Sequence, residues 1–104
     1  MIRHIVLIKF TRHASEPDIA EIFGGLAALT QRLPGACGFA GGRSQSPEQI
    51  ERGYMHGFTV DFHSWEDLKT YAVHPEHKAL GARIVANAEG GIDGVLVLDL
   101  NVPN

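Results

Sequence analysis

The sequence predicts an α+β domain whose elements follow the order β-α-β-β-α-β. Three observations support this fold class. Four segments are rich in β-branched and aromatic residues, two longer segments repeat apolar residues at helical spacing, and a helix follows both the first and the third strand. This order is the split pattern of ferredoxin-like folds, in which four strands form an antiparallel sheet and the helices cover one of its faces.

The first half of the chain supplies two strands and one helix. Residues 2–10 predict the first strand, which is apolar on both faces at its centre. Ser15 is placed to cap a helix that the Pro34-Gly35 pair ends. A weak, glycine-rich strand is expected over residues 37–44, followed by a polar loop over 45–52. The apolar residues of the helix recur at helical spacing: Ile19, Ile22, Phe23, Leu26, Leu29 and Leu33.

The second half repeats this order with an interrupted helix. Residues 54–63 predict the third strand, and Ser64 followed by Asp67 is typical of a helix start. Pro75 disfavours helical backbone at the preceding residue, so we expect a break there and a second helical segment beyond it. Residues 94–102 predict the last strand. The buried stripe of the first segment is expected to comprise Trp65, Leu68 and Ala72.

The sheet face without helices should be apolar as well. The first strand carries Ile5 and Leu7 opposite Val6 and Ile8, and the last strand shows the same two-sided pattern. An antiparallel sheet covered on one side normally has a polar outer face. Because this outer face is apolar, a second copy of the same sheet is the simplest cover. We therefore predict a homodimer that closes sheet to sheet.

Length, charge and cysteine content limit the classes of function. The 104 residues form a single expected domain, 1–104, and the net charge of -3 gives no general attraction to nucleic acid. No apolar run is long enough for a signal peptide or a membrane span. Cys37 is the sole cysteine, which excludes an internal disulfide and a thiolate-based zinc site. A cytoplasmic location is expected.

Titratable side chains gather in the segment from Tyr71 to His77, which contains a phenol and two imidazoles. His4 and His56 lie on the richer apolar faces of two strands that are neighbours in the predicted sheet. We expect them to line one cavity between helices and sheet with Tyr71 and His77. There, neutral His77 would act as a general base on an acidic C–H bond, and Tyr71 would hydrogen-bond the developing enolate.

Structural roles compete with this hypothesis. His4 and His56 fit a role as hydrogen-bonded core residues equally well, and His74 is expected to cap the helix that begins at Pro75. A metal site at His74, Glu76 and His77 is a minor alternative, because these residues lack the H-E-x-x-H spacing of zinc enzymes. No metal or other cofactor is expected.

Four segments resemble the stress-responsive α/β-barrel domain family, also called Dabb: residues 2–10, 53–60, 62–68 and 71–77. The resemblance implies a dimeric α/β barrel. In its olivetolic acid cyclase-like members, which need no cofactor, the functional tyrosine and histidine match Tyr71 and His77. Supporting pocket histidines match His4 and His56, and Phe23 is expected to add to the ligand-binding surface. The lining for a long alkyl chain is not evident in this sequence.

Two classes of function follow from the sequence. The first is a small-molecule-binding protein, acting as a cofactor-independent cyclase or isomerase with a histidine base. The second is a non-catalytic dimeric stress-response or structural protein. Related dimeric barrels include cofactor-free oxygenases, but no residue of this sequence singles out that chemistry.

Overall fold

The computed structural model describes residues 1–104 and has the predicted order of elements. The chain forms β1 (Ile2–Ile8), α1 (Glu16–Arg32), β2 (Ala36–Arg43), β3 (His56–Phe62), α2 (Trp65–Ala72), α3 (Pro75–Ala86), a short 3-10 helix η1 (Gly91–Gly94) and β4 (Val95–Asn101). No helix is long and apolar enough to cross a membrane.

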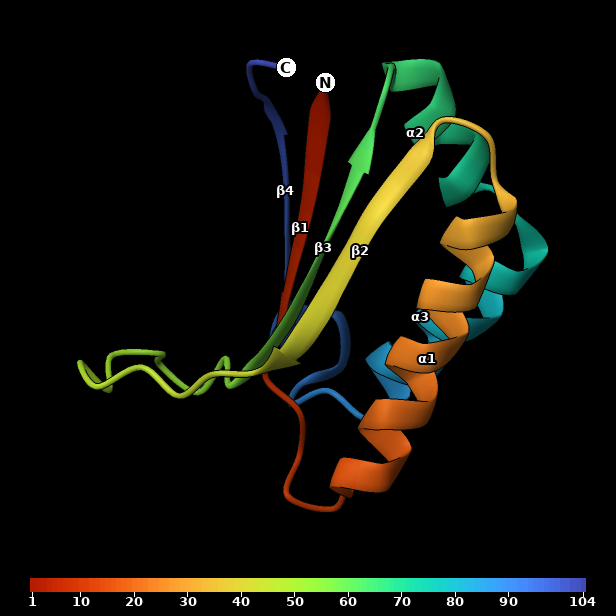
Figure 1. Ribbon diagram of the computed structural model, residues 1–104. Helices are drawn as coiled ribbons and strands as arrows, with labels where there is room; N and C mark the ends of the chain where they lie inside the picture. Colours follow the sequence, from red (N-terminus) through yellow and green to blue (C-terminus); the bar gives the residue numbers. More distant parts are fainter.

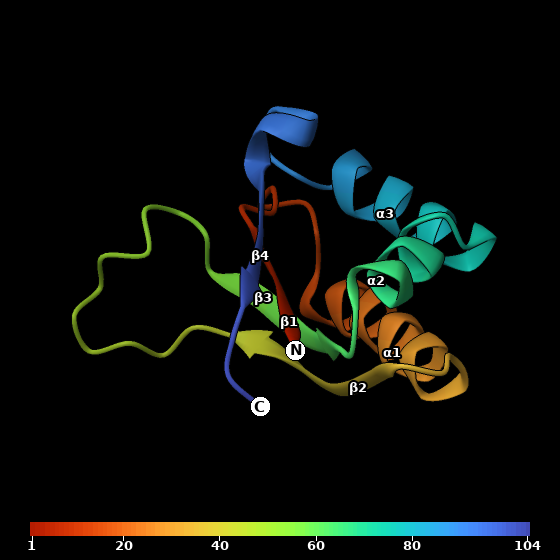
Figure 2. The ribbon, with the colours of Figure 1, turned by 90° about the horizontal axis from the view of Figure 1, so that it is seen from above.

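The four strands form one antiparallel sheet in the order β2-β3-β1-β4. All three α-helices lie on the same side of this sheet (Figures 1 and 2). The ferredoxin-like α+β fold is therefore confirmed, with β1 and β3 as adjacent central strands. The core lies between these strands and α1, and its fully buried members include Ile8, Ile22, Leu26, Leu29, Val60 and Phe62.

Three strands are shorter than predicted, β4 by one residue at each end. β1 ends at Ile8 because the backbone of Lys9 pairs instead with Glu89 and Gly94, outside the sheet. Phe10 forms only an isolated bridge with Ala88. β3 begins at His56 because the residues before it belong to the projecting β2–β3 connection.

The helix boundaries follow the predicted caps. The Ser15 and Ser64 hydroxyls accept hydrogen bonds from the backbone N–H groups of Asp18 and Asp67. The predicted burial of Trp65 and Ala72 is wrong, since Trp65 is 56% exposed and Ala72 is exposed as well. Tyr71 is the buried residue of α2 instead, and its ring packs against Phe62 at the end of β3.

Two ion pairs and one close approach hold α3 against α1, directly after the helix break before Pro75. Arg32 on α1 pairs with Glu76, and Arg83 donates a hydrogen bond to Glu21 at 2.9 Å. A Cβ atom at Gly25 would lie 3.0 Å from the Leu80 side chain, so glycine permits this close approach of the two helices.

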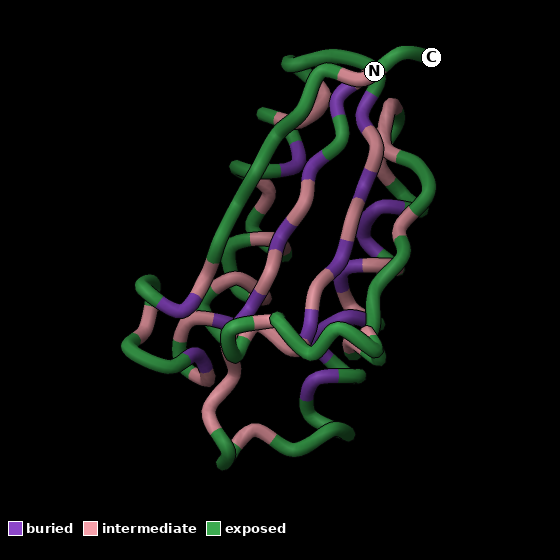
Figure 3. Tube along the Cα trace, turned by 90° about the vertical axis from the view of Figure 1, so that its left-hand side faces the viewer, coloured by how far each residue is buried: buried purple, intermediate pink, exposed green.

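The outer face of the sheet is uncovered and is apolar over the middle of β1 and over β4, as predicted, while the Arg3–Asp61 ion pair and Thr59 make its β3 part polar. The central strands alternate between buried and half-buried residues, with mostly exposed strands on either side (Figure 3). On β4 the outward-facing residues Leu96, Leu98 and Leu100 are each about half exposed. They continue the outward-facing residues Ile5 and Leu7 of β1 into one apolar surface, here called the outer face.

Candidate functional site

Tyr71 is the centre of the first cluster of predicted residues. It lies in the last turn of α2 with 0% of its surface exposed. Its ring centroid lies 4.3 Å from that of His77, 5.1 Å from that of Phe62 and 5.8 Å from that of His4. The structure thus brings together three of the four residues predicted for the pocket.

The Tyr71 hydroxyl is the one buried side-chain polar atom without a hydrogen-bond partner. Burial raises the pKa of Tyr71 above its usual value, so the phenol stays protonated and keeps its donor. An unpaired buried polar group costs about 1–3 kcal/mol and is rare in folded proteins. The hydroxyl is therefore an unpaired hydrogen-bond donor on a ring that packs against the rings of His77 and His4.

His77 is held as a neutral base beside this hydroxyl. Its Nδ1 lies 3.1 Å from the backbone oxygen of Ala72, which can only accept, so Nδ1 carries the proton. The lone pair of the neutral ring is then on Nε2. Desolvation is the main cause that lowers the pKa of His77, and the nearby His4 and His74 lower it further. The helix break before Pro75 leaves the Ala72 carbonyl available for this bond.

Asp99 was not anticipated as part of this cluster. It lies directly opposite His4 on β4, and its Oδ1 is 2.6 Å from His4 Nδ1. A carboxylate acceptor fixes the proton on Nδ1 and orients the ring. The sequence does contain one signal for Asp99: residues alternate between the two faces along the last strand, and this alternation puts Asp99 on the helix-facing side. The partner of Asp99 depends on the strand register, which that period does not give.

His56 lies apart from these residues, at the other end of the sheet face. Its Nε2 is 2.8 Å and 3.1 Å from the two carboxylate oxygens of Glu16, and Arg43 lies 3.7 Å from the same carboxylate. A hollow of about 270 Å³ between α1 and β2 is lined by His56 and Phe23. His56 and Phe23 therefore line the same surface depression.

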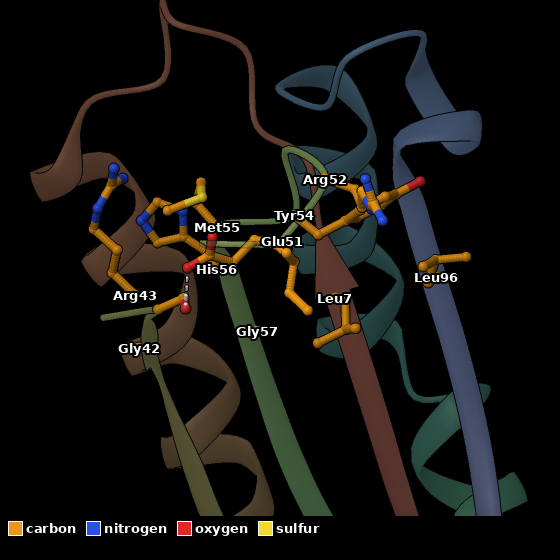
Figure 4. Close-up of a pocket in the computed structure, with 12 residues that line it drawn as sticks. Leu7, Gly42, Arg43, Glu51, Arg52, Tyr54, Met55, His56, Gly57 and Leu96 are labelled. Carbon is orange, nitrogen blue, oxygen red and sulfur yellow. Dashed lines mark hydrogen bonds between the residues drawn. The ribbon is translucent and has the colours of Figure 1, made fainter. Parts of the chain in front are cut away.

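The expected single cavity with all four residues is not present. The five main hollows include none lined by His4, Tyr71 or His77. Aromatic rings fill the space between the two clusters instead: Phe58 lies 6.3 Å from His4 and 5.4 Å from Phe23, centroid to centroid. The largest hollow, about 670 Å³, lies between the outer face and the β2–β3 connection (Figure 4).

The remaining histidines have local roles. His74 caps α3, accepting a hydrogen bond at its Nδ1 from the backbone N–H of Glu76. His13 and His63 are exposed. No group of three histidine, cysteine or acidic side chains is arranged to hold a metal ion.

Comparisons with known proteins agree on one family. A model described as Stress responsive A/B Barrel Domain matches residues 2–102. The stress-response A/B barrel domain-containing protein HS1 of Arabidopsis thaliana is 31% identical over 98 residues, which cover 94% of this chain and 86% of HS1. Olivetolic acid cyclase of Cannabis sativa is 28% identical over 80 residues, covering 77% of this chain and 79% of the cyclase.

A solved structure has the same fold over nearly the full length. It is a dimeric ferredoxin-like protein of unknown function from Jannaschia sp. CCS1, with a TM-score of 0.91 and 35% identity. The match covers 97% of this chain and 98% of that protein. These matches confirm the resemblance seen in the sequence: the chain belongs to the stress-responsive A/B barrel domain family.

Proposed function

We propose that this protein binds a small carbonyl compound at the Tyr71 cluster and catalyses proton transfer at carbon without a cofactor, as a cyclase or isomerase. One observation carries the proposal. The Tyr71 hydroxyl is fully buried without a partner, and the Tyr71 ring packs against His77 and His4, each held in one tautomer by a hydrogen bond at Nδ1. A carbonyl oxygen of a ligand would supply the missing acceptor.

The proposed chemistry assigns each group one role. His77 Nε2 takes a proton from the carbon beside the carbonyl, and the electron pair of that C–H bond moves to form an enolate. The Tyr71 hydroxyl donates a hydrogen bond to the enolate oxygen, where negative charge develops. His4, oriented by Asp99, positions the ligand from the opposite side of the phenol. General-base catalysis of this kind contributes about 10²–10⁴-fold.

Entry of a ligand requires movement of the helix break. Tyr71 is fully buried on the last turn of α2, directly before the break between α2 and α3, and this break can shift without opening the sheet. His56 and Phe23 line a separate hollow, so we propose that they contact a ligand only as an outer binding surface. The similarity to olivetolic acid cyclase supports a carbonyl substrate.

The test combines binding with exchange at carbon. Olivetolic acid binding is followed by isothermal titration. Deuterium uptake at carbon is followed by proton NMR with a panel of cyclic ketones, aromatic ketones and 1,3-diketones. We expect uptake with at least one compound, lost in His77→Ala and retained in His63→Ala, an exposed histidine, as the matched histidine control. Absence of both olivetolic acid binding and His77-dependent exchange would contradict the proposal.

A non-catalytic dimeric stress-response or structural role is the second candidate. The observation that favours it is the close packing around Tyr71, where none of the main hollows reaches the phenol. Under this role, Tyr71→Phe would leave every ligand response unchanged. Under the enzymatic role, the same substitution removes the donor and weakens both binding and exchange.

We also propose that the protein is a homodimer closed through the outer face. The apolar side chains of that face and the dimeric state of the Jannaschia relative support this assembly. Light scattering at roughly 10 µM tests it, because stable interfaces of this kind bind well below that concentration. A monomeric mass would contradict the dimer. A cytoplasmic location stays a prediction.

A further inference from the structure

We propose that residues 44–55, here called the arm, clasp a second copy of this chain, whose outer face fills the hollow at the base of the arm. The inference rests on the dimer proposed above and assigns it a second contact surface. The arm joins β2 to β3 and leaves the sheet on the side opposite the helices (Figures 1 and 2). Any copy seated on the outer face must therefore meet it.

The hollow is built from both surfaces. Leu7 and Leu96 of the outer face line it together with Ile50 and Met55 of the arm. Figure 4 shows Leu7, Leu96 and Met55 around the hollow. Because Leu96 also belongs to the row of outward-facing leucines on β4, the hollow continues the apolar surface without interruption. Charged side chains, among them those of Glu51 and Arg52, complete the lining. Apolar side chains with charged neighbours are the usual composition of a protein interface.

The arm has a defined shape although none of its residues is buried. The Ser44 hydroxyl donates a hydrogen bond to Glu51 at 2.6 Å, and the Tyr54 N–H donates to the Glu51 carbonyl at 3.0 Å. Gln49 and Arg52 have φ values of 55° and 58°, which residues with side chains rarely adopt. Such backbone persists where the surroundings hold it and is frequent at binding surfaces.

Ile50 is the exposed apolar side chain through which the arm would contact the second copy. It is 59% exposed in the single chain and is flanked by the polar residues Gln49 and Glu51. A second copy fits this feature better than a small ligand, because the hollow opens onto the same surface that the copy covers. In a two-fold dimer each contact occurs twice, so one substitution removes two contacts.

The test compares two exposed isoleucines. Ile50→Asp places a charge at the proposed contact, whereas Ile92→Asp places one at a residue of η1 that is 66% exposed. Dimer dissociation constants are measured by sedimentation over roughly 0.1 to 100 µM, with circular dichroism as the check on folding. We expect Ile50→Asp to raise the constant by at least about tenfold, and Ile92→Asp to leave it unchanged. Leu98→Asp, in the outer face itself, reports on the sheet-to-sheet contact alone.

The outcomes separate the arm from the dimer. Dissociation by both Leu98→Asp and Ile50→Asp supports the clasp. Dissociation by Leu98→Asp with a wild-type constant for Ile50→Asp overturns the clasp and leaves the sheet dimer standing. A wild-type protein that is monomeric throughout overturns the proposed dimer itself. A small molecule released on denaturation of wild type but absent from Ile50→Asp, at equal dimer strength, would assign the hollow to a ligand instead.

Discussion

The two histidine clusters lie on the same face of the same sheet, yet their polar groups are satisfied differently. At one end, His56 Nε2 and the Glu16 carboxylate pair with each other beside two surface hollows. At the other end, Asp99 and the Ala72 carbonyl hold His4 and His77, but the phenol between them has no partner.

This difference separates a structural ion pair from a candidate reaction site. A paired histidine at the edge of a hollow needs no ligand to complete its hydrogen bonds. A fully buried hydroxyl without an acceptor lowers the stability of the fold, and such exceptions in native proteins are typical of functional positions. We therefore place the chemistry at the Tyr71 cluster, and the four predictions that follow test this separation.

The largest expected effect is on catalysis. His77→Ala removes the proposed base and should lower the rate of carbon–deuterium exchange by about 10²–10⁴-fold. His56→Ala removes a histidine of equal size from the other cluster and should change the rate by less than about tenfold, because it does not contact Tyr71. Equal losses in the two variants, with folding unchanged, would show that the clusters do not differ in function.

The next effect is on stability. Tyr71→Phe removes the unpaired hydroxyl and retains the ring, so the free energy of unfolding should rise by about 1 kcal/mol. Tyr54→Phe is the matched control, because Tyr54 is half-buried and its ring retains the contact with Lys9, 5.0 Å from the centroid. Urea unfolding measures both. A loss of stability in Tyr71→Phe would show that the hydroxyl already has a partner.

The ion pair between His56 and Glu16, in the other cluster, should contribute less to the free energy of unfolding. Glu16→Gln removes the charge that faces His56, and we expect a loss below about 1 kcal/mol, because the Glu16 side chain is mostly exposed. Glu21→Gln breaks a pair with Arg83 that is exposed on both sides and should change stability even less. A loss of several kcal/mol in Glu16→Gln would mean that the His56 cluster stabilises the fold more than the account allows.

The smallest effect is on the pH dependence of stability. The pKa of folded His77 is lowered, so the unfolded chain binds its proton more tightly. The contribution of His77 is therefore fully present above the unfolded pKa of about 6.5 and is lost as the pH falls toward the folded value. Urea unfolding between about pH 7 and 5 should show a shallower decline in His77→Gln than in wild type. An unchanged slope would contradict the lowered pKa.

The sequence predicted the fold and the faces of the strands better than the site. Alternating apolar residues placed His4 and His56 on the helix-facing side, and the capping residues Ser15 and Ser64 marked two helix starts. These are local signals, read from residues close together in the chain. The segment from Tyr71 to His77 predicted that these two residues lie together and that His74 caps a helix. The structure shows both contacts.

The separation of the histidines could not be predicted, because it depends on register. A two-residue period fixes the face of a strand but not its position along the partner. His4 pairs with Val60, four residues along β3 from His56, which places the two backbones roughly 13 Å apart. Because the register is not given, the sequence also did not predict the contact between Asp99 and His4, which exists only in the observed pairing of β1 with β4.

The central claim is that His77 is a neutral base whose Nε2 is free beside Tyr71. Nitrogen-15 NMR of the imidazole side chains across pH measures this directly. We predict that His77 carries its proton on Nδ1 and that its pKa lies below the ordinary histidine value of about 6.5. A proton on Nε2, or a pKa above that ordinary value, would contradict the account.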